Sequence, residues 1–396
     1  MALGCPLRPG AATYACSVAS HNASRSPGIK HSRLSAGLVT VGAGLLIAYL
    51  VLVLSASPAR SESVRVVEPA VALPRVVGDA DDCAIWVHPT DRAKSLVIGN
   101  DKSGPKRGIY VYGLRGEVLQ FVPIERPSNV DVRYGMTLGG RSVDICAVVE
   151  RNRNQLRVFA IDPATRQLTE VSAPKGISTH IEGQTYGLAL YKRPSDGVIF
   201  AITSAKRRGG ELRQIQLRDD GSGKVGGVFV RAFGHSDIKT YVEGMVADDE
   251  LGFLYAADEQ HALLKYHADP ARGHKLVHKF AVRDGVRGDR EGIAIYHCAD
   301  GTGYILLSSQ GNSTVKVYAR QGDNHFITTI DTVGAHDTDG LDVTSCPAGP
   351  TFPKGFLACH DTRGRCYVLY RWEDVAGTGL KVAPGYNPRR PARTSK

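Results

Sequence analysis

Apolar and polar positions alternate with a period of two in many short stretches of this chain, for example at residues 95–99, 108–112 and 304–308. The stretch 143–149 is almost wholly apolar. β-Branched and aromatic residues are common in these stretches, and glycine, aspartate and asparagine stand at their ends. This pattern is typical of β-strands separated by turns, and the sequence shows no long amphipathic pattern of helical period. The sequence therefore predicts an all-β protein.

A short phrase that opens a strand-like stretch returns six times, with successive starts 52, 52, 57, 48 and 48 residues apart. The phrases are Asp82-Cys83-Ala84-Ile85, Tyr134-Gly135-Met136-Thr137, Tyr186-Gly187-Leu188-Ala189, Glu243-Gly244-Met245-Val246, Glu291-Gly292-Ile293-Ala294 and Asp339-Gly340-Leu341-Asp342. A strand-rich repeat of about 50 residues is typical of a β-propeller, with one four-stranded blade per repeat. We expect a six-bladed β-propeller with four-stranded antiparallel blades. Residues 64–77 should complete the last blade and leave no free edge.

The chain outside the repeats differs in composition. Residues 38–54 form an uncharged apolar run, preceded by basic residues and followed by Ser55-Ala56-Ser57-Pro58-Ala59. This layout indicates a signal peptide, although a run of this length is also at the lower limit for a membrane anchor. We therefore expect a leader at 1–59, the propeller at 60–380 and a disordered basic tail at 381–396. Either interpretation of the leader predicts a secreted or periplasmic protein, the second of them anchored by 38–54.

Charge and cysteine content narrow the chemistry further. The formal net charge is +10, but the basic residues do not form runs, so the sequence does not indicate nucleic-acid binding and instead suits an anionic ligand. Cys346, Cys359 and Cys366 fall within one repeat, close enough for a disulfide between two of them, and export would permit it. The apolar strand contexts of Cys83 and Cys146 favour buried thiols instead, as does that of Cys298.

The first residues of the repeated phrases are candidate metal ligands, because equivalent positions of all blades face one central axis. They are Asp82, Tyr186, Glu243, Glu291 and Asp339, whereas Tyr134 lacks a nearby carboxylate and is expected to serve in packing. Further acidic residues stand just before the phrases or in the polar clusters that follow them: Asp79, Asp81, Asp258, Glu259, Asp289 and Asp337. Oxygen ligands without cysteine or several histidines select Ca²⁺ or Mg²⁺ over Zn²⁺. So many carboxylates at one mouth predict several bridging cations.

A second polar cluster follows each phrase and divides the ring by charge. The first three repeats contribute Lys102, Arg151 and Lys206, and the last three contribute Glu259, Gln310 and Asp361. Cations beside bridged metals form a site for a polyanion, with phosphate as the natural guest. Water held between two metal ions loses its proton more easily and can attack phosphorus in line. We therefore predict phosphoryl-group hydrolysis, with Glu243, Asp339, Glu291 and Tyr186 in the catalytic group.

Other catalytic motifs do not account for the sequence. It contains no His-Glu-x-x-His, Arg-His-Gly or Gly-x-Ser-x-Gly motif. The spacing from Cys359 to Arg365 matches that of cysteine-dependent phosphatases, but a strand-like stretch follows it instead of the helix that such a loop must open.

Six stretches together resemble the β-propeller phytases, which are alkaline, calcium-dependent phosphatases of myo-inositol hexakisphosphate. They are DADDCAIW at 79–86, NVDVR at 129–133, EGMVADDE at 243–250, EGIAIY at 291–296, SSQGN at 308–312 and DTDGLD at 337–342. The resemblance covers residues 64–375 and implies a six-bladed propeller, a calcium-bridged water as nucleophile and no covalent enzyme intermediate. It implies calcium ligands at Asp81, Asp82, Tyr186, Glu243, Glu259, Glu291 and Asp339. It also implies phosphate contacts from Lys102, Arg151 and Lys206, although many relatives carry two lysines where this chain has Asp101-Lys102.

Two alternatives remain at this level. A calcium-dependent lactonase or esterase can also use a six-bladed propeller, but with one catalytic calcium and no need for three phosphate-binding cations. A non-enzymatic binding propeller could use the carboxylates to brace its blades. The expected partner is phytate as a small-molecule substrate, and the sequence implies a monomer without a protein partner.

Overall fold

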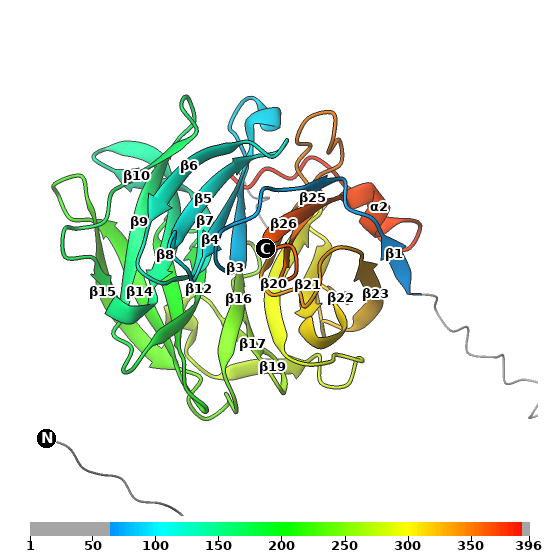
Figure 1. The fold of residues 1–396 in the computed structure, drawn as a ribbon. Coiled ribbons are helices and arrows are strands. Elements are labelled where there is room, and N and C mark those ends of the chain that lie inside the picture. Colours follow the sequence, from blue (N-terminus) through cyan, green and yellow to red (C-terminus); the bar gives the residue numbers. More distant parts are fainter. Residues whose placement is uncertain (1–63, 390–396) are drawn as a thin grey trace, which may run out of the picture. The chain divides into compact units, whose positions relative to one another are not determined.

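The computed structural model describes residues 64–389, and their strands form six sheets arranged around a central axis (Figure 1). The predicted six-bladed β-propeller is therefore confirmed. The expected leader at 1–59, including its apolar run at 38–54, lies outside the described residues. Within 64–389, no helix has the length and apolar character needed to cross a membrane.

In the first three blades, chain order runs outward from the axis and every pairing along the sheet is antiparallel. Blade 1 consists of β3 (Ala80–Trp86), β4 (Leu96–Asp101), β5 (Gly108–Gly113) and β6 (Val118–Pro123). Blade 2 consists of β7 (Pro127–Leu138), β8 (Arg141–Glu150), β9 (Gln155–Asp162) and β10 (Gln167–Glu170), with β11 (Ile177–Ser178) also paired to β9. Blade 3 consists of β12 (Thr185–Lys192), β13 (Ile199–Ala205), β14 (Leu212–Asp219) and β15 (Val225–Phe233).

The last three blades repeat this plan until the ring closes. Blade 4 consists of β16 (Val242–Asp248), β17 (Phe253–Asp258), β18 (Ala262–His267) and β19 (Leu276–Phe280). Blade 5 consists of β20 (Arg290–His297), β21 (Gly303–Ser309), β22 (Thr314–Ala319) and β23 (Phe326–Thr332). Blade 6 begins with β24 (Leu341–Thr344), β25 (Phe356–Asp361) and β26 (Cys366–Arg371). The helical elements are short: η1 (Arg92–Lys94), η2 (Arg151–Arg153), η3 (Pro270–Arg272), η4 (Gln310–Asn312) and α2 (Trp372–Ala376).

The amino-terminal segment of the described chain closes the ring. β2 (Val71–Ala72) pairs antiparallel with β26 as the outermost strand of blade 6, as predicted for residues 64–77. β1 (Arg65–Val67) pairs with β23 in blade 5, and this pairing is parallel. The segment therefore supplies an edge strand to two blades instead of one, so blade 5 has five strands and is not purely antiparallel.

Apolar side chains from facing blades fill the spaces between the sheets. One large cluster joins blades 1, 2 and 6, and another joins blades 5 and 6 around Trp372, whose ring stacks on Tyr296 with 3.7 Å between centroids. All six cysteines between residues 64 and 389 are free and buried. Burial confirms the interpretation of Cys83, Cys146 and Cys298, and no disulfide joins the three cysteines of the last repeat.

Residues 381–389 are ordered against the propeller, so the prediction of a disordered tail is wrong for this part of it. The Lys381 amide donates to the Tyr304 hydroxyl at 2.8 Å, and the Tyr386 ring stacks on His297 with 4.5 Å between centroids. Arg389 forms an ion pair with Asp144. Composition alone could not reveal these contacts, because their partners come from distant repeats.

Candidate active site at the channel mouth

The six inner strands bring one residue from each blade to the same end of the central channel. Each inner strand contacts the inner strands of both neighbouring blades. In the first five blades, the inner strand contains a β-bulge at its start, where two residues stand out of the regular pairing. A bulge locally redirects side chains, and here it sets the first of these residues at the mouth. The resulting ring is Asp81, Ser128, Tyr186, Glu243, Glu291 and Asp339.

This alignment corrects two members of the predicted ring. Asp81, not Asp82, is equivalent to Glu243, and Asp82 stands where later blades have glycine. Blade 2 contributes Ser128 instead of Tyr134, which lies farther along β7. The Tyr134 hydroxyl accepts a hydrogen bond from the Val87 amide at 3.0 Å, so its predicted packing role is confirmed.

Glycine follows the ring residue in four blades because neighbouring inner strands approach closely there. A Cβ atom on Gly244 would lie 1.7 Å from the Glu291 carbonyl oxygen, and one on Gly292 would lie 2.4 Å from the Asp339 carbonyl oxygen. No side chain fits at such distances. The repeated glycine therefore allows the strands to pack around a narrow axis, and this packing brings the ring residues together.

Glu243, Glu259 and Glu291 form the centre of the anionic half. All three are buried, and each offers a carboxylate oxygen within 4.8 Å of the others. Burial, together with nearby Asp81, raises the pKa of Glu243 to about 7. Burial and Glu243 likewise raise the pKa of Glu259 to about 7, and burial and Asp339 raise that of Glu291 well above its usual range. Such a group holds protons in the absence of a cation and releases them when one binds.

Lys102 bridges the seam between the first and last blades. Its ammonium lies 2.6 Å from Asp81 Oδ1 and 3.6 Å from carboxylate oxygens of both Asp79 and Asp339. Burial alone would raise the pKa of Asp81, but the charge and hydrogen bond of Lys102, together with smaller contributions from His360 and Asp339, lower it overall. The pKa of Asp339 is raised by burial and by Asp81. The lysine therefore supplies positive charge where three carboxylates converge.

Arg151 and Lys206 form the rest of the cationic half, and both lie against the ring of Tyr186. The guanidinium carbon of Arg151 lies 4.5 Å from the centroid of the Tyr186 ring, and the ammonium of Lys206 lies 4.4 Å from it. Arg151 is buried, whereas Lys206 is exposed apart from its partly covered ammonium. That partial burial and the nearby Arg151 charge lower the pKa of Lys206. Of the residues predicted for the anionic half, Glu259 lies in the carboxylate group, whereas Asp361 ends β25 and accepts a hydrogen bond from the His336 amide instead.

Several buried polar atoms of the mouth have no hydrogen-bond partner within the described chain. They are Asp81 Oδ2, Glu259 Oε1, Glu291 Oε2, and Nε and Nη2 of Arg151. Buried polar atoms are normally paired, so this concentration indicates a site built for ligands. The acceptors are all carboxylate oxygens, which suits Ca²⁺, and the donors belong to a guanidinium, which suits phosphate. The residues present therefore fit both groups that the sequence predicts.

Other predicted ligands lie at or near the mouth but differ in their contacts. Asp82 accepts hydrogen bonds from Asn129 Nδ2 and the Val130 amide, both at 3.1 Å. Asp289 is half-buried beside the group and contributes to the raised pKa values of Glu259 and Glu291. Asp337 is exposed, on the loop before β24.

Asp258 has a structural role instead of the predicted ligand role. Its oxygens accept hydrogen bonds from the Lys239 amide at 2.7 Å and the Thr240 amide at 2.9 Å, and also from the Thr240 hydroxyl. Asp101 holds the turn at residues 78–79 in the same way. The equivalent residue of blade 6 is Asp361, which accepts from the His336 amide at 3.1 Å. The last residue of the second strand thus caps the preceding loop, and the position after it faces the mouth.

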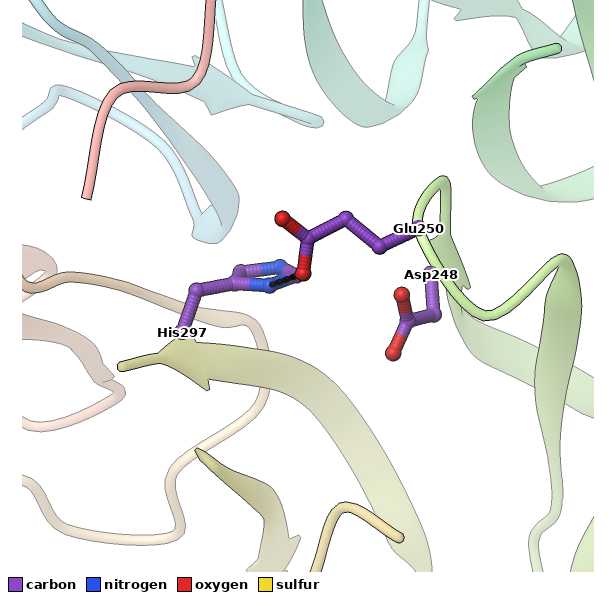
Figure 2. A group of neighbouring side chains, drawn as sticks. All are labelled: Asp248, Glu250 and His297. Carbon is purple, nitrogen blue, oxygen red and sulfur yellow. Dashed lines mark ion pairs between the residues drawn. The ribbon is translucent and has the colours of Figure 1, made fainter. Parts of the chain in front are cut away.

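A second charged group lies at the other end of the channel, and the sequence did not indicate that its members come together. Asp248, Glu250 and His297 lie together there (Figure 2). Buried Arg320 contacts both oxygens of Asp248, at 2.6 and 2.7 Å, and Glu250 Oε2 at 2.6 Å. One guanidinium thus binds both carboxylates, so they form a salt-bridged structural network. Arg320 follows the outer strand β22, and no local sequence signal indicates its partners.

A cavity of about 120 Å³ adjoins this network and is lined by the far ends of the inner strands. Its charged lining residues are Asp131, Arg133, Asp249 and Asp342, and Tyr386 from the carboxy-terminal segment also contributes to the wall. Arg133 Nη1 lies 3.1 Å from Asp131 Oδ1, and Arg133 Nε lies 3.3 Å from Asp249 Oδ2.

Comparisons with known proteins agree with the geometry of the mouth. The family model described as Phytase matches residues 35–365. The chain is also 35% identical, over 377 residues, to a 3-phytase of Bacillus subtilis (strain 168). That match covers 89% of this chain and 96% of the relative.

Proposed function

The chain belongs to the phytase family, and we propose that its channel mouth is a calcium-dependent phosphatase site. Family membership makes the protein a phosphoric monoester hydrolase of the 3-phytase type, which hydrolyses phytate to inorganic phosphate and lower inositol phosphates.

The observation that carries the proposal is the division of buried, unpartnered atoms between the two halves of the mouth. Free carboxylate oxygens of Asp81, Glu259 and Glu291 stand on one side, and free guanidinium nitrogens of Arg151 stand on the other. Leaving an unpaired charge buried costs several kcal/mol, so neither half is stable by itself unless a ligand or solvent compensates it. A calcium phosphate ester would satisfy both halves at once.

Each side chain has a role that follows from its position. Glu243, Glu259, Glu291, Asp81 and Asp339 would hold several calcium ions, with Tyr186 beside Glu243 and Glu259. When bound, calcium supplies positive charge against the phosphate oxygens and makes water easier to deprotonate.

The cationic side chains would bind and orient the substrate. Arg151 can donate two parallel hydrogen bonds to one phosphate, and its packing against Tyr186 fixes the guanidinium plane. Lys206 and Lys102 add positive charge, but their ammonium groups lack the flat shape with which a guanidinium orients a phosphate. Glu243, in the anionic half, is close enough to Lys102 and Arg151 for both charges to act on its pKa, and its carboxylate can take up the proton of the attacking water.

Phosphate release from phytate, measured in calcium and in excess EDTA, tests the proposal. We expect release in calcium, its loss in EDTA and its return when calcium is restored. Lactone and carboxylic ester substrates should not be hydrolysed, because a lactonase has no use for Lys102, Arg151 and Lys206. Phytate hydrolysis that is unaffected by the chelator would contradict the calcium-dependent site without contradicting family membership.

We further propose that the protein is exported and acts as a monomer. The apolar run at 38–54, followed by small residues, supports export. Sequencing the amino terminus of the protein recovered outside the cytoplasm distinguishes a cleaved leader from a retained anchor. Light scattering in calcium tests the monomer.

A further inference from the structure

The loop before blade 5 lacks the acidic cap that holds the loops before blades 1, 4 and 6. In those blades an aspartate at the end of the second strand accepts hydrogen bonds from loop amides, as Asp258 does from Thr240 at 2.9 Å. In blade 5 the pairing of β20 with β21 places Ser309 at this position, and its hydroxyl accepts from the Arg287 amide at 2.9 Å. The carboxylate is missing, so the loop at 281–289 is anchored from another position.

Arg290 anchors this loop from the opposite strand. It is the first residue of β20, and its exposed fraction is 6%. Its Nε donates to the Ala281 carbonyl at 2.9 Å, and its Nη2 donates to the Val282 carbonyl at 3.4 Å. These two carbonyls follow directly after β19. The guanidinium therefore joins the first residues of the loop to the residue that ends it.

The backbone at Ala281 shows that this anchor holds an unfavourable conformation. Ala281 is buried and has a φ of 57°, in the left-handed region that is costly for a residue with a Cβ atom. Such a conformation persists only where surrounding contacts impose it. The hydrogen bond from Arg290 Nε to the carbonyl of this residue is one such contact.

The same arginine also binds the main chain of Glu259. The Arg290 amide donates to the Glu259 carbonyl at 2.9 Å, and Nη1 donates to the same oxygen at 3.1 Å. Glu259 belongs to the carboxylate group of the mouth, and Arg290 itself lies between Asp289 and Glu291 in the chain. One residue thus connects the loop, Glu259 and the inner strand that carries Glu291.

The contacts of Arg290 depend on the shape of its guanidinium and not on an ion pair. Nε, Nη1 and Nη2 all donate to main-chain carbonyls, and no ion pair among residues 64–389 includes this side chain. A positive charge near a calcium site would by itself weaken cation binding, so the charge alone does not explain its presence. The equivalent residues of blades 1–4 are uncharged: Ala80, Pro127, Thr185 and Val242.

We propose that Arg290 is a positioning residue that fixes Glu259 and the loop at 281–289 relative to the carboxylate group. Its rigid set of donors holds the main chain at both places, so that the carboxylates of Glu259 and Asp289 keep a defined arrangement. The inference rests on the proposed function, because it assigns the placement of a calcium ligand. A partner that orients a metal ligand typically changes metal affinity by about 10–100-fold when it is removed.

Two substitutions separate orientation from charge. Arg290→Met removes both the donors and the charge, whereas Arg290→Lys keeps the charge but loses the planar set of donors. Calcium affinity is read from the CaCl₂ concentration at which the melting temperature begins to rise, which does not depend on turnover. We expect both variants to need about 10-fold more calcium than wild type. Tighter calcium binding in Arg290→Met, or wild-type affinity in Arg290→Lys, would show that only the charge acts and would overturn the proposal.

Arg231→Met is the matched control. Arg231 lies in the outer strand β15 and also donates to the main chain, with Nη2 2.7 Å from the His267 carbonyl oxygen. We expect this change to lower the melting temperature in EDTA while the calcium requirement stays unchanged. The same result in both Arg290 variants would mean a merely structural role and would contradict the inference. Should Arg290→Met fail to fold, the calcium requirement of Arg290→Lys decides.

Amide hydrogen exchange in EDTA keeps the inference separate from the calcium proposal. In Arg290→Lys, exchange should become faster at the amide of position 290, which binds the Glu259 carbonyl, and at the Gln310 amide, which binds the Asp289 carbonyl. The Thr240 amide, held by Asp258, should keep its wild-type rate. Unchanged exchange at 290 and 310 would overturn the inference. If wild type shows no calcium-dependent rise in melting temperature, the calcium site fails, and these exchange rates still decide whether Arg290 holds the loop and Glu259.

Discussion

The two ends of the central channel hold similar residues but differ in how their polar atoms are paired. The mouth contains Asp81, Glu243 and Glu291, and the far end contains Asp131, Asp249 and Asp342, all carried by the inner strands or the residues next to them. Each end also contains an arginine. Composition would therefore mark both as candidate sites.

At the far end, the carboxylates are hydrogen-bonded to the backbone of neighbouring blades. Asp342 Oδ2 accepts from the Ile85 amide and Asp131 Oδ2 from the Leu190 amide, both at 2.7 Å. Asp249 Oδ1 accepts from the Lys192 amide at 2.9 Å. These contacts join blades and leave little capacity for a ligand. At the mouth, by contrast, oxygens of Asp81, Glu259 and Glu291 are buried without partners.

The comparison teaches that unpartnered carboxylate oxygens, and not charge itself, distinguish the mouth, because the atoms without a hydrogen-bond partner at the far end are the nitrogens Arg133 Nε and His297 Nδ1. Burying carboxylates costs free energy at both ends, and at the far end hydrogen bonds and ion pairs within the protein offset this cost. At the mouth it is offset only when ligands bind. Substitutions at the mouth should therefore change activity, whereas substitutions at the far end should change stability.

The largest expected effect is on turnover, from Glu243→Gln. This change removes the central charge of the anionic half, and we expect kcat for phytate to fall by about 100-fold or more. Stability in EDTA at pH 8 should not decrease, because a buried carboxylate with a raised pKa becomes neutral. Asp342→Asn is the matched control, because it also neutralises a buried carboxylate with a raised pKa but lies at the far end, so kcat should stay near normal. Wild-type turnover in Glu243→Gln would contradict the assignment of the mouth.

The next largest effect is on stability, from Arg320→Met. Removing the guanidinium leaves Asp248 buried without its partner, which should lower the free energy of unfolding by about 3–5 kcal/mol. Urea denaturation measures this loss, and kcat per folded molecule should be unchanged. Arg115→Met, which removes an exposed ion pair with Glu117, should cost less than about 1 kcal/mol. A large loss of kcat in Arg320→Met would remove the distinction between the two ends.

Calcium should change the contribution of the mouth to the pH dependence of stability but leave the contribution of the far end unchanged. Folded-state carboxyls with raised pKa values keep protons that the unfolded chain has lost, so stability should fall as pH rises from about 4 to about 7. Glu243 and Glu259, each with a pKa of about 7, contribute at the mouth; Asp249 and Asp342, with pKa values of about 6 and about 7, contribute at the far end.

In EDTA each of these four carboxyls should lower the free energy of unfolding by up to about 3–4 kcal/mol across this range, because one pKa unit corresponds to about 1.4 kcal/mol. Saturating calcium should remove only the part of this pH dependence that comes from the mouth, because metal binding displaces protons there. Urea denaturation across this pH range, with and without calcium, measures both shares. Calcium that abolishes the whole dependence, or none of it, would contradict the assignment of cations to one end.

A smaller effect is expected on substrate affinity from Lys102→Ala. Losing one phosphate-binding cation should raise KM for phytate by about 10-fold, which corresponds to about 1.4 kcal/mol, with a smaller change in kcat. Exposed Lys106 is the control, because Lys106→Ala should leave KM unchanged. If Lys106→Ala raises KM as much as Lys102→Ala does, the effect comes from general charge and not from the site.

The smallest effect is expected from Tyr386→Ala in the carboxy-terminal segment. This change removes the ring stacked on His297 and should lower the free energy of unfolding by about 1 kcal/mol, measured in urea, with kcat unchanged. A change in KM for phytate would show that the two ends of the channel are coupled.

Much of this architecture could be predicted from sequence, because each blade repeats the same local pattern of strands and turns. The alternation of apolar residues and the repeat of about 50 residues predicted six blades, and the glycine after Glu243 or Glu291 marked the mouth. The register failed by one residue at Asp82, because blade 1 has two adjacent aspartates and no glycine after the ring residue to mark the position. Tyr134-Gly135 resembles Tyr186-Gly187 in sequence and also stands at a bulge, but it is the second bulge of β7, and the first, at Ser128 and Asn129, is equivalent to the bulge of β12.

Contacts between distant repeats could not be predicted. Asp258 and Glu259 are adjacent and both acidic, yet one caps a loop and the other lies in the anionic group. The choice depends on which of them faces the Thr240 amide, and that is settled by tertiary structure. The partners of Arg320 and Tyr386 are hidden for the same reason.

The pairing of β2 with β26 also sets the order in which the enzyme can become active. Val71 is synthesised among the first residues of the propeller, but its partner Leu369 is among the last. Closing so long a loop is entropically costly and must wait until blade 6 exists. Asp81 and Lys102 meet Asp339 only across that final seam. A nascent chain that lacks its last blade therefore has no complete mouth, so catalytic competence arrives in one step, at ring closure.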